Sequence, residues 1–256
     1  MLRALHTAAT GMEAQQRKID TTANNIANVN TTGFKSSRAE FQELLTQQIR
    51  PAGQGGGPVG VDVGLGVKTA ATSRSFTQGA LEATENPLDV AIEGAGFFQV
   101  QSPQGDQLFS RAGNFKVNGE GELVTADGMQ LVPSIVIPQD ATGVSIERDG
   151  IVSVTLPGDT QPVEVGRLEL ATFTNPAGMK SLGRNLFAQT QASGQPQLAV
   201  PGEQGTGELS QGFLEGSNVE IVTEMIDMIV SQRAYEINSK VIQTADEMLR
   251  SVTNLR

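Results

Sequence analysis

The chain has 256 residues, of which 38 % are hydrophobic and 18 % charged, and its formal net charge is −10. An acidic chain repels nucleic-acid phosphates and anionic lipid headgroups, so we expect neither as a partner. The chain contains no cysteine, which excludes disulfides, thiolate chemistry and every metal site that needs a cysteine ligand.

The apolar runs are only a few residues long, far short of the roughly 20 residues that cross a bilayer, so no membrane insertion is expected. Polar side chains interrupt the first 20 residues, which therefore lack the apolar region of a signal peptide. If the protein leaves the cytoplasm, we expect it to do so without a cleaved leader.

Residues 2–29 have apolar residues at a heptad-like spacing. One row, seven residues apart, consists of Leu5, Met12, Ile19 and Ile26. A second row, three residues earlier in each heptad, consists of Leu2, Ala9, Gln16 and Ala23. This alternation predicts a helix that packs against other helices. Gly33 can adopt the left-handed turn that ends such a helix, so we expect an N-terminal helical domain over residues 1–33.

Residues 51–66, PAGQGGGPVGVDVGLG, are dominated by Gly and Pro. This composition excludes a helix and favours an extended or hairpin-like connection. We therefore assign residues 34–67 to a linker or an extended insert.

From residue 68 to residue 216 the apolar residues alternate with polar ones. The alternating pairs are Val90/Ile92, Phe98/Val100, Phe115/Val117, Ile135/Ile137, Val144/Ile146, Val152/Val154, Val163/Val165 and Leu168/Leu170. Half-buried antiparallel strands give this period of two. Turn sequences such as Asn118-Gly119 and Asp149-Gly150 separate the strands, and no helix-length stripe lies between them. The pattern predicts an antiparallel β domain over residues 68–216.

Residues 217–256 return to a helical spacing. The apolar positions are Val222, Ile226, Ile229, Ile237, Val241, Met248, Val252 and Leu255. Ser217 and Glu220 have the spacing of a capping box, which would start the helix. The predicted fold class is therefore mainly β, with long α-helices at both ends of the chain.

An amphipathic helix needs a partner for its apolar face. A pair formed by the two terminal helices alone would leave much of the wider C-terminal face in contact with water, and neighbouring copies could cover the rest. The alternative is that both helices fold back onto the β domain. We favour assembly, and we expect the termini to be largely disordered in the monomer, since ordering each residue costs about 1–2 kcal/mol.

Several motifs resemble those of the flagellar axial proteins, the rod and hook family. Residues 23–28 (ANNIAN) and 32–35 (TGFK) are similar to its N-terminal signature, and residues 217–219 (SNV) and 231–238 (SQRAYEIN) to its C-terminal signature. Residues 88–100, LDVAIEGAGFFQV, resemble the β domain of the rod members, and residues 165–168 and 172–175 fit the distal rod. The motif residues are Asn24, Asn25, Asn28, Gly33, Phe34, Lys35, Ser217, Asn218, Arg233, Ala234 and Tyr235.

The resemblance implies a structural subunit of the distal rod, which polymerises into a rigid tube that transmits torque. The helices of residues 1–33 and 217–256 would form a coiled-coil layer around an export channel, with the β domain outside. Implied partners are further copies, the proximal rod and hook proteins, the surrounding bushing rings and the flagellar type III export apparatus. The implied location is the periplasm-spanning basal body. Residues 46–66 correspond to an insert that stiffens the tube.

No catalytic, cofactor or metal site is expected. His6 is the only histidine, and the Gly-rich segment lacks the phosphate-binding loop sequence. The acidic pairs Glu120/Glu122 and Glu147/Asp149 could resemble a glycosidase dyad, but they lie beside turn glycines, where charged residues are normally solvated.

Three asparagines on neighbouring helical turns, Asn24, Asn25 and Asn28, are costly unless their amides find partners. The alternatives are a solvated helix end and a polar ladder between neighbouring subunits, and the second is favoured by the resemblance. For the whole chain, the alternatives to a distal rod subunit are a proximal rod protein of the same family and a secreted β-domain adhesin or carbohydrate-binding module.

Overall fold

The computed structural model describes residues 2–50, 60–158 and 161–254. The chain divides into two compact units. Unit 1 comprises Met1–Ala27, Ser37–Ser75 and Glu220–Arg256, and unit 2 comprises Asn28–Ser36 and Phe76–Val219. Unit 1 carries 11 Lys and Arg residues and 11 Asp and Glu residues, whereas unit 2 carries 7 and 17. The whole net charge of −10 therefore belongs to unit 2.

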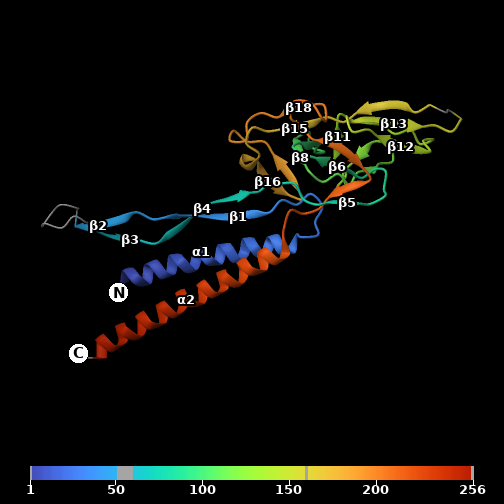
Figure 1. The fold of residues 1–256 in the computed structure, drawn as a ribbon. Coiled ribbons are helices and arrows are strands. Elements are labelled where there is room, and N and C mark those ends of the chain that lie inside the picture. Colours follow the sequence, from blue (N-terminus) through green and yellow to red (C-terminus); the bar gives the residue numbers. More distant parts are fainter. Residues whose placement is uncertain (1, 51–59, 159–160, 255–256) are drawn as a thin grey trace. The chain divides into compact units, whose positions relative to one another are not determined.

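Two helices, α1 (Leu2–Ala27) and α2 (Ile221–Asn254), form an antiparallel pair in unit 1. Figure 1 shows both chain termini at the same end of this pair. Lys18 donates to Asp227 at 3.0 Å, and further along the pair a Cβ on Gly11 would lie 3.0 Å from the Asn238 amide nitrogen. Gly11 therefore permits a close approach of the two helices.

Four strands complete unit 1. β1 (Ser37–Glu43) pairs antiparallel with β4 (Val67–Arg74), and β2 (Thr46–Arg50) pairs with β3 (Val61–Gly64). Helix α1 contacts both β1 and β4, and the Val67 amide donates to the Thr10 hydroxyl at 3.4 Å. Strands β2 and β3 lie on either side of residues 51–59, which are outside the described residues. The segment expected to be extended or hairpin-like thus forms part of an antiparallel strand pair.

Unit 2 is built from antiparallel strand pairs, as the alternating pattern predicted. Its largest sheet has the order β16-β17-β8-β7-β11-β10-β9, with β15 pairing both β7 and β18. These strands are β7 (Phe97–Gln101), β8 (Gln107–Ser110), β9 (Lys116–Val117), β10 (Leu123–Val124), β11 (Gln130–Val132), β15 (Leu170–Thr172), β16 (Lys180–Gly183), β17 (Leu186–Ala188) and β18 (Gln197–Ala199).

Three smaller sheets and one short helix complete unit 2. The sheet β12-β13-β14 consists of Gly143–Ile146, Ile151–Thr155 and Val163–Arg167. Strand β6 (Val90–Glu93) pairs with β19 (Glu208–Gln211), and β5 (Leu81–Ala83) pairs with β20 (Phe213–Glu215). The 3-10 helix is Pro176–Gly178.

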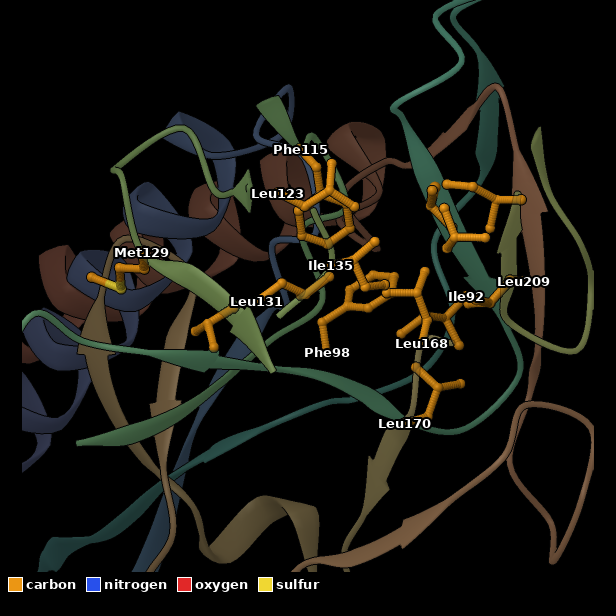
Figure 2. Close-up of a cluster of buried hydrophobic side chains, with 14 of the residues drawn as sticks. Ile92, Phe98, Phe115, Leu123, Met129, Leu131, Ile135, Leu168, Leu170 and Leu209 are labelled. Atoms are coloured by element: carbon orange, nitrogen blue, oxygen red, sulfur yellow. The ribbon is translucent and has the colours of Figure 1, made fainter. Parts of the chain in front are cut away.

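Unit 2 has two hydrophobic clusters, and strand β7 contributes to both. Phe98 and Val100 belong to the larger cluster, part of which Figure 2 shows, whereas Phe97 belongs to a smaller one rich in phenylalanine. Because successive side chains of a strand point to opposite faces, β7 is buried on both. The alternation predicted that only one face of β7 would be buried. The structure differs from this prediction, because Phe97 and Gln99 on the other face are also buried.

Both helices are shorter than expected. Helix α1 ends at Ala27, not near Gly33, and the intervening residues form turns in which the Thr31 amide donates to the Asn28 carbonyl at 3.1 Å. Helix α2 begins at Ile221, so the predicted capping box does not form. The Ser217 hydroxyl instead accepts from the Val219 amide at 3.3 Å. The predicted boundary after residue 67 falls within β4, which belongs to unit 1.

Candidate assembly surface

Helix α2 exposes most of its large apolar side chains. Val222 is 65 % exposed, Ile226 57 % and Ile237 62 %. Ile229, Val241 and Met248 are also exposed, as are Ile221, Met225 and Val230. Burying one such side chain stabilises a protein by about 1.5–3 kcal/mol. Burying the whole apolar face of α2 against a partner would therefore be strongly favourable.

The residues of α2 that are buried are small. Ser231 is 1 % exposed and Ala245 3 %, and Asn238 lies between them in the same row of seven-residue spacing. Asn238 contacts α1 at Gly11. On the α2 side, the α1–α2 pair thus packs mainly through small and polar side chains and leaves most of the large apolar ones exposed.

Helix α1 buries its predicted apolar row only in part. Leu5, Met12, Ile19 and Ile26 are half-buried, whereas Ala9, Gln16 and Ala23 of the second predicted row are exposed. Of the remaining predicted packing residues, the side chains of Leu2 and Val252, and all of Leu255, lie outside the described residues. The exposed second row is free for a further contact.

The two ends of unit 2 meet at a buried cluster of charges. The Lys35 ammonium donates to the Glu215 carboxylate at 2.7 Å and to the Thr77 carbonyl at 2.7 Å. The Arg111 guanidinium donates to the same carboxylate at 2.9 Å. Lys35 and Glu215 are fully buried and Arg111 is 3 % exposed. Two cations therefore share one buried carboxylate.

Burial and charge act in opposite directions on these groups. Burial lowers the pKa of the Lys35 ammonium, against the opposing hydrogen bond and charge of Glu215. Burial alone would raise the pKa of Glu215, but the charges and hydrogen bonds of Arg111 and Lys35 outweigh it and hold that pKa below its ordinary value. The carboxylate is thus stabilised in its charged form.

The motif residues beside Lys35 join the same junction. Gly33 has a φ of 69°, and its amide donates to the Glu215 carbonyl at 2.7 Å. A Cβ on Gly33 would lie 2.8 Å from the Ala112 nitrogen, so only glycine fits this approach. Phe34 is buried.

Asn218 connects the C-terminal motif to the same segment. Its side-chain oxygen accepts from the Ser36 amide at 2.7 Å, and its nitrogen donates to the Thr77 hydroxyl at 2.9 Å. The Asn218 amide donates to the Phe34 carbonyl at 3.4 Å. The TGFK and SNV motifs, far apart in sequence, therefore fix each other within unit 2.

Asn25 has its partners within the chain. Its side chain is 2 % exposed, donates to the Ser37 carbonyl at 2.8 Å and accepts from the Ser37 amide at 2.9 Å. It also donates to the Glu224 carboxylate at 3.0 Å. These contacts correct the expectation that Asn25 belongs to a ladder between subunits, because its hydrogen bonds join α1, β1 and α2 of one copy.

The other motif residues lie at the surface or between surface and interior. Asn24 is exposed and Asn28 is half-buried, where its side chain accepts from the Thr31 hydroxyl at 3.2 Å. Arg233 is exposed and pairs with Glu236 at 3.1 Å, Tyr235 is 38 % exposed, and Ala234 is half-buried.

Two carboxylates of the acidic pairs that could resemble a glycosidase dyad are held by neighbouring side chains. Glu122 accepts from Asn118 and Gln130, and Asp149 pairs with Arg167 at 3.1 Å, so both carboxylates have structural partners. Within the described ranges, no three His, Asp or Glu side chains are grouped so that they could hold a metal ion. Neither described helix is long and apolar enough to span a membrane.

Comparisons with known proteins agree with the motifs. Family profiles described as "Flagella basal body rod protein", "Flagellar hook protein FlgE/F/G D1 domain" and "Flagellar basal body rod FlgEFG protein C-terminal" match residues 5–35, 91–154 and 210–255. The flagellar basal-body rod protein FlgG of Borreliella burgdorferi is 48 % identical, over 100 % of this chain and 99 % of that protein. That of Agrobacterium fabrum is 50 % identical over 98 % of both. The chain belongs to the flagellar basal-body rod protein family.

This family membership confirms the expectation from the motifs that the chain is a rod and hook family protein. It also confirms a structural role in the flagellar rod. A rod protein with the same name from Caulobacter vibrioides is 48 % identical over the full length of both chains. The buried Glu215 and Arg111 of this rod protein were not predicted, although Glu215 is a single charge between Leu214 and Gly216.

Proposed function

We propose that the chain is a structural subunit of the distal flagellar rod, which polymerises into a rigid tube that transmits torque and encloses the export channel. The exposed apolar face of α2 carries this proposal. In the assembly it would be buried between copies, and residues 1–33 and 217–256 would together form a coiled-coil layer.

The assembly residues are those with free apolar surface and the terminal positions that continue the same rows. They are Leu2, Leu5, Met12, Ile19, Ile26, Val222, Ile226, Ile229, Ile237, Val241, Met248, Val252 and Leu255. The family relationship supports further copies, proximal rod and hook proteins, surrounding ring proteins and the type III export apparatus as partners. It supports the periplasm-spanning basal body as the location. The β2–β3 hairpin would stiffen the tube.

A direct test is polymerisation of the purified chain at raised concentration, followed by pelleting and electron microscopy. The full chain should form straight tubes. Replacing Ile226 and Ile229 by Asp should abolish the tubes, because charges would enter the apolar contact. Gln243→Asp, an exposed site on the same helix, is the matched control and should polymerise. Tubes from the doubly substituted chain would contradict the proposal.

A further inference from the structure

Two exposed residues of α2, Arg233 and Lys240, form what we call the basic row. They are seven residues apart, and each follows a residue of the seam with α1, Ser231 or Asn238, by two positions. Two positions are about 200° around an α-helix. The basic row therefore points away from the α1 of its own copy and lies beside the exposed apolar side chains of α2.

Helix α1 has a matching acidic row, Glu13 and Asp20. Both are exposed and also seven residues apart. They follow Gly11 and Lys18, which contact α2, by the same two positions. The acidic row thus points away from its own α2. It lies beside the exposed second row of α1, in which the residues Ala9, Gln16 and Ala23 are small or polar.

The two faces complement each other in charge and in size. Two α2 faces would bring basic rows together, and two α1 faces would bring acidic rows together. Only α2 against α1 joins opposite charges, and it places large apolar side chains over small ones. Because the two surfaces differ, the contact is head-to-tail and can repeat without closing.

The spacing also agrees with one relative direction. If copies repeat with their helices aligned, α2 of one copy runs antiparallel to α1 of the next. Arg233 then lies opposite Asp20 when Lys240 lies opposite Glu13, because both rows advance by seven residues. The next position on each helix brings Glu247 opposite His6. Within the two rows, no like charges meet in this register.

The present partners of the rows would compete little with this contact. Glu13 pairs with Arg17 at 3.2 Å and Arg233 with Glu236 at 3.1 Å, each along its own helix, and these four side chains are more than half exposed. Asp20 accepts from the Gln16 side chain of the same helix at 3.0 Å, also at an exposed position. Ion pairs of this kind contribute little to stability.

We propose that the basic row of α2 docks on the acidic row of α1 of the next copy and fixes the register of the polymer. The proposal rests on the assembly function above and assigns its partner surface, a second copy of this chain. It gives Arg233, a motif residue, a defined role.

Charge reversal with rescue tests the contact, with the critical concentration for pelleting as the measurement. Arg233→Glu with Lys240→Glu should raise it about tenfold, and Glu13→Lys with Asp20→Lys should do the same, because each pair of changes opposes like charges. Combining all four changes in one chain should restore values near those of the wild type. If the four-fold variant is as defective as its parents, the proposal is wrong.

A control reverses the same number of charges outside the rows. Lys116→Glu with Lys180→Glu alters exposed residues of unit 2, and the α1 reversal should not rescue any defect that it causes. Failure of the wild-type chain to polymerise under any condition would instead contradict the assembly function itself, so the two failures are distinguishable.

Cross-linking gives a second, independent measurement, since the chain has no cysteine of its own. Polymer grown from mixed copies, some with Asp20→Cys and some with Arg233→Cys, should yield disulfide dimers that contain one of each. Dimers formed as readily by Arg233→Cys copies alone would show α2 against α2 and overturn the proposal.

Discussion

Glu215 is the residue on which the junction of unit 2 depends. Besides Lys35 and Arg111, its carboxylate accepts from the Gly79 amide at 2.9 Å. A buried charge pair adds little net stability compared with an apolar replacement, but removing one partner leaves the others uncompensated. The cluster therefore acts mainly by selecting one arrangement of the chain, and it adds little to the free energy of folding.

Glu215→Gln should destabilise unit 2 by about 3–5 kcal/mol, because two buried cations lose their counter-charge. Urea unfolding, followed by circular dichroism, measures this. The control is Glu208→Gln, whose carboxylate pairs with Arg148 at 3.7 Å at the surface. It should change the free energy of unfolding by less than about 0.5 kcal/mol. Equal effects of the two changes would contradict the role assigned to the cluster.

The same carboxylate makes stability depend on pH. Its pKa is lower in the folded than in the unfolded chain, so the folded state binds fewer protons between the two values. The contribution is fully present above the unfolded pKa, about 4.3, and is lost as the pH falls through the lower folded pKa. Unfolding free energies measured from pH 6 to pH 3 should therefore fall less steeply for Glu215→Gln than for the wild type.

At the scale of elements, Asn25 connects two helices and a strand. An amide is required, because the side chain both donates to and accepts from Ser37. Asn25→Asp keeps the shape but places a carboxylate beside Glu224 and the Ser37 carbonyl. We expect the critical concentration for polymerisation to rise about tenfold. Gln243→Glu, the same chemical change at an exposed position of α2, should leave it nearly unchanged.

The α1–α2 pair packs through small side chains, so it gains little from apolar burial within one copy. We therefore predict that α1 and α2 are largely disordered in dilute monomer and fold when neighbouring copies cover α2. Amide hydrogen exchange tests this prediction. The helix amides should exchange rapidly in monomer and slowly in polymer, whereas those of β7 should be protected in both. Protected helix amides in dilute monomer would refute it.

Sequence periodicity predicted which elements exist, but not how they pair. The large residues of α2 mark a helix, yet its intramolecular seam consists of Ser231, Asn238 and Ala245, which give no hydrophobic signal. Glu215 was missed because its partners Arg111 and Lys35 are 104 and 180 residues away in sequence. Strand β7 was taken as half-buried because Phe98 and Val100 alternate, although the other face of the strand is also covered.

For the whole molecule, unit 2 should fold without the two terminal helices. A fragment of residues 28–219 keeps all of unit 2, including Lys35 and Glu215, together with strands β1 to β4 of unit 1, and it loses both helices. It should unfold cooperatively and remain monomeric at concentrations at which the full chain polymerises, as measured by sedimentation velocity. Tubes formed by this fragment would mean that the β domain alone drives assembly.

The unequal division of charge has a consequence for the polymer. Each copy adds a balanced unit 1 and a unit 2 with a net charge of −10. A filament of such copies is a polyelectrolyte, and its β domains should collect an atmosphere of cations about 8 Å deep at physiological ionic strength. The cations around the filament are therefore attracted by unit 2, whereas unit 1 can pack against neighbouring copies without accumulating net charge.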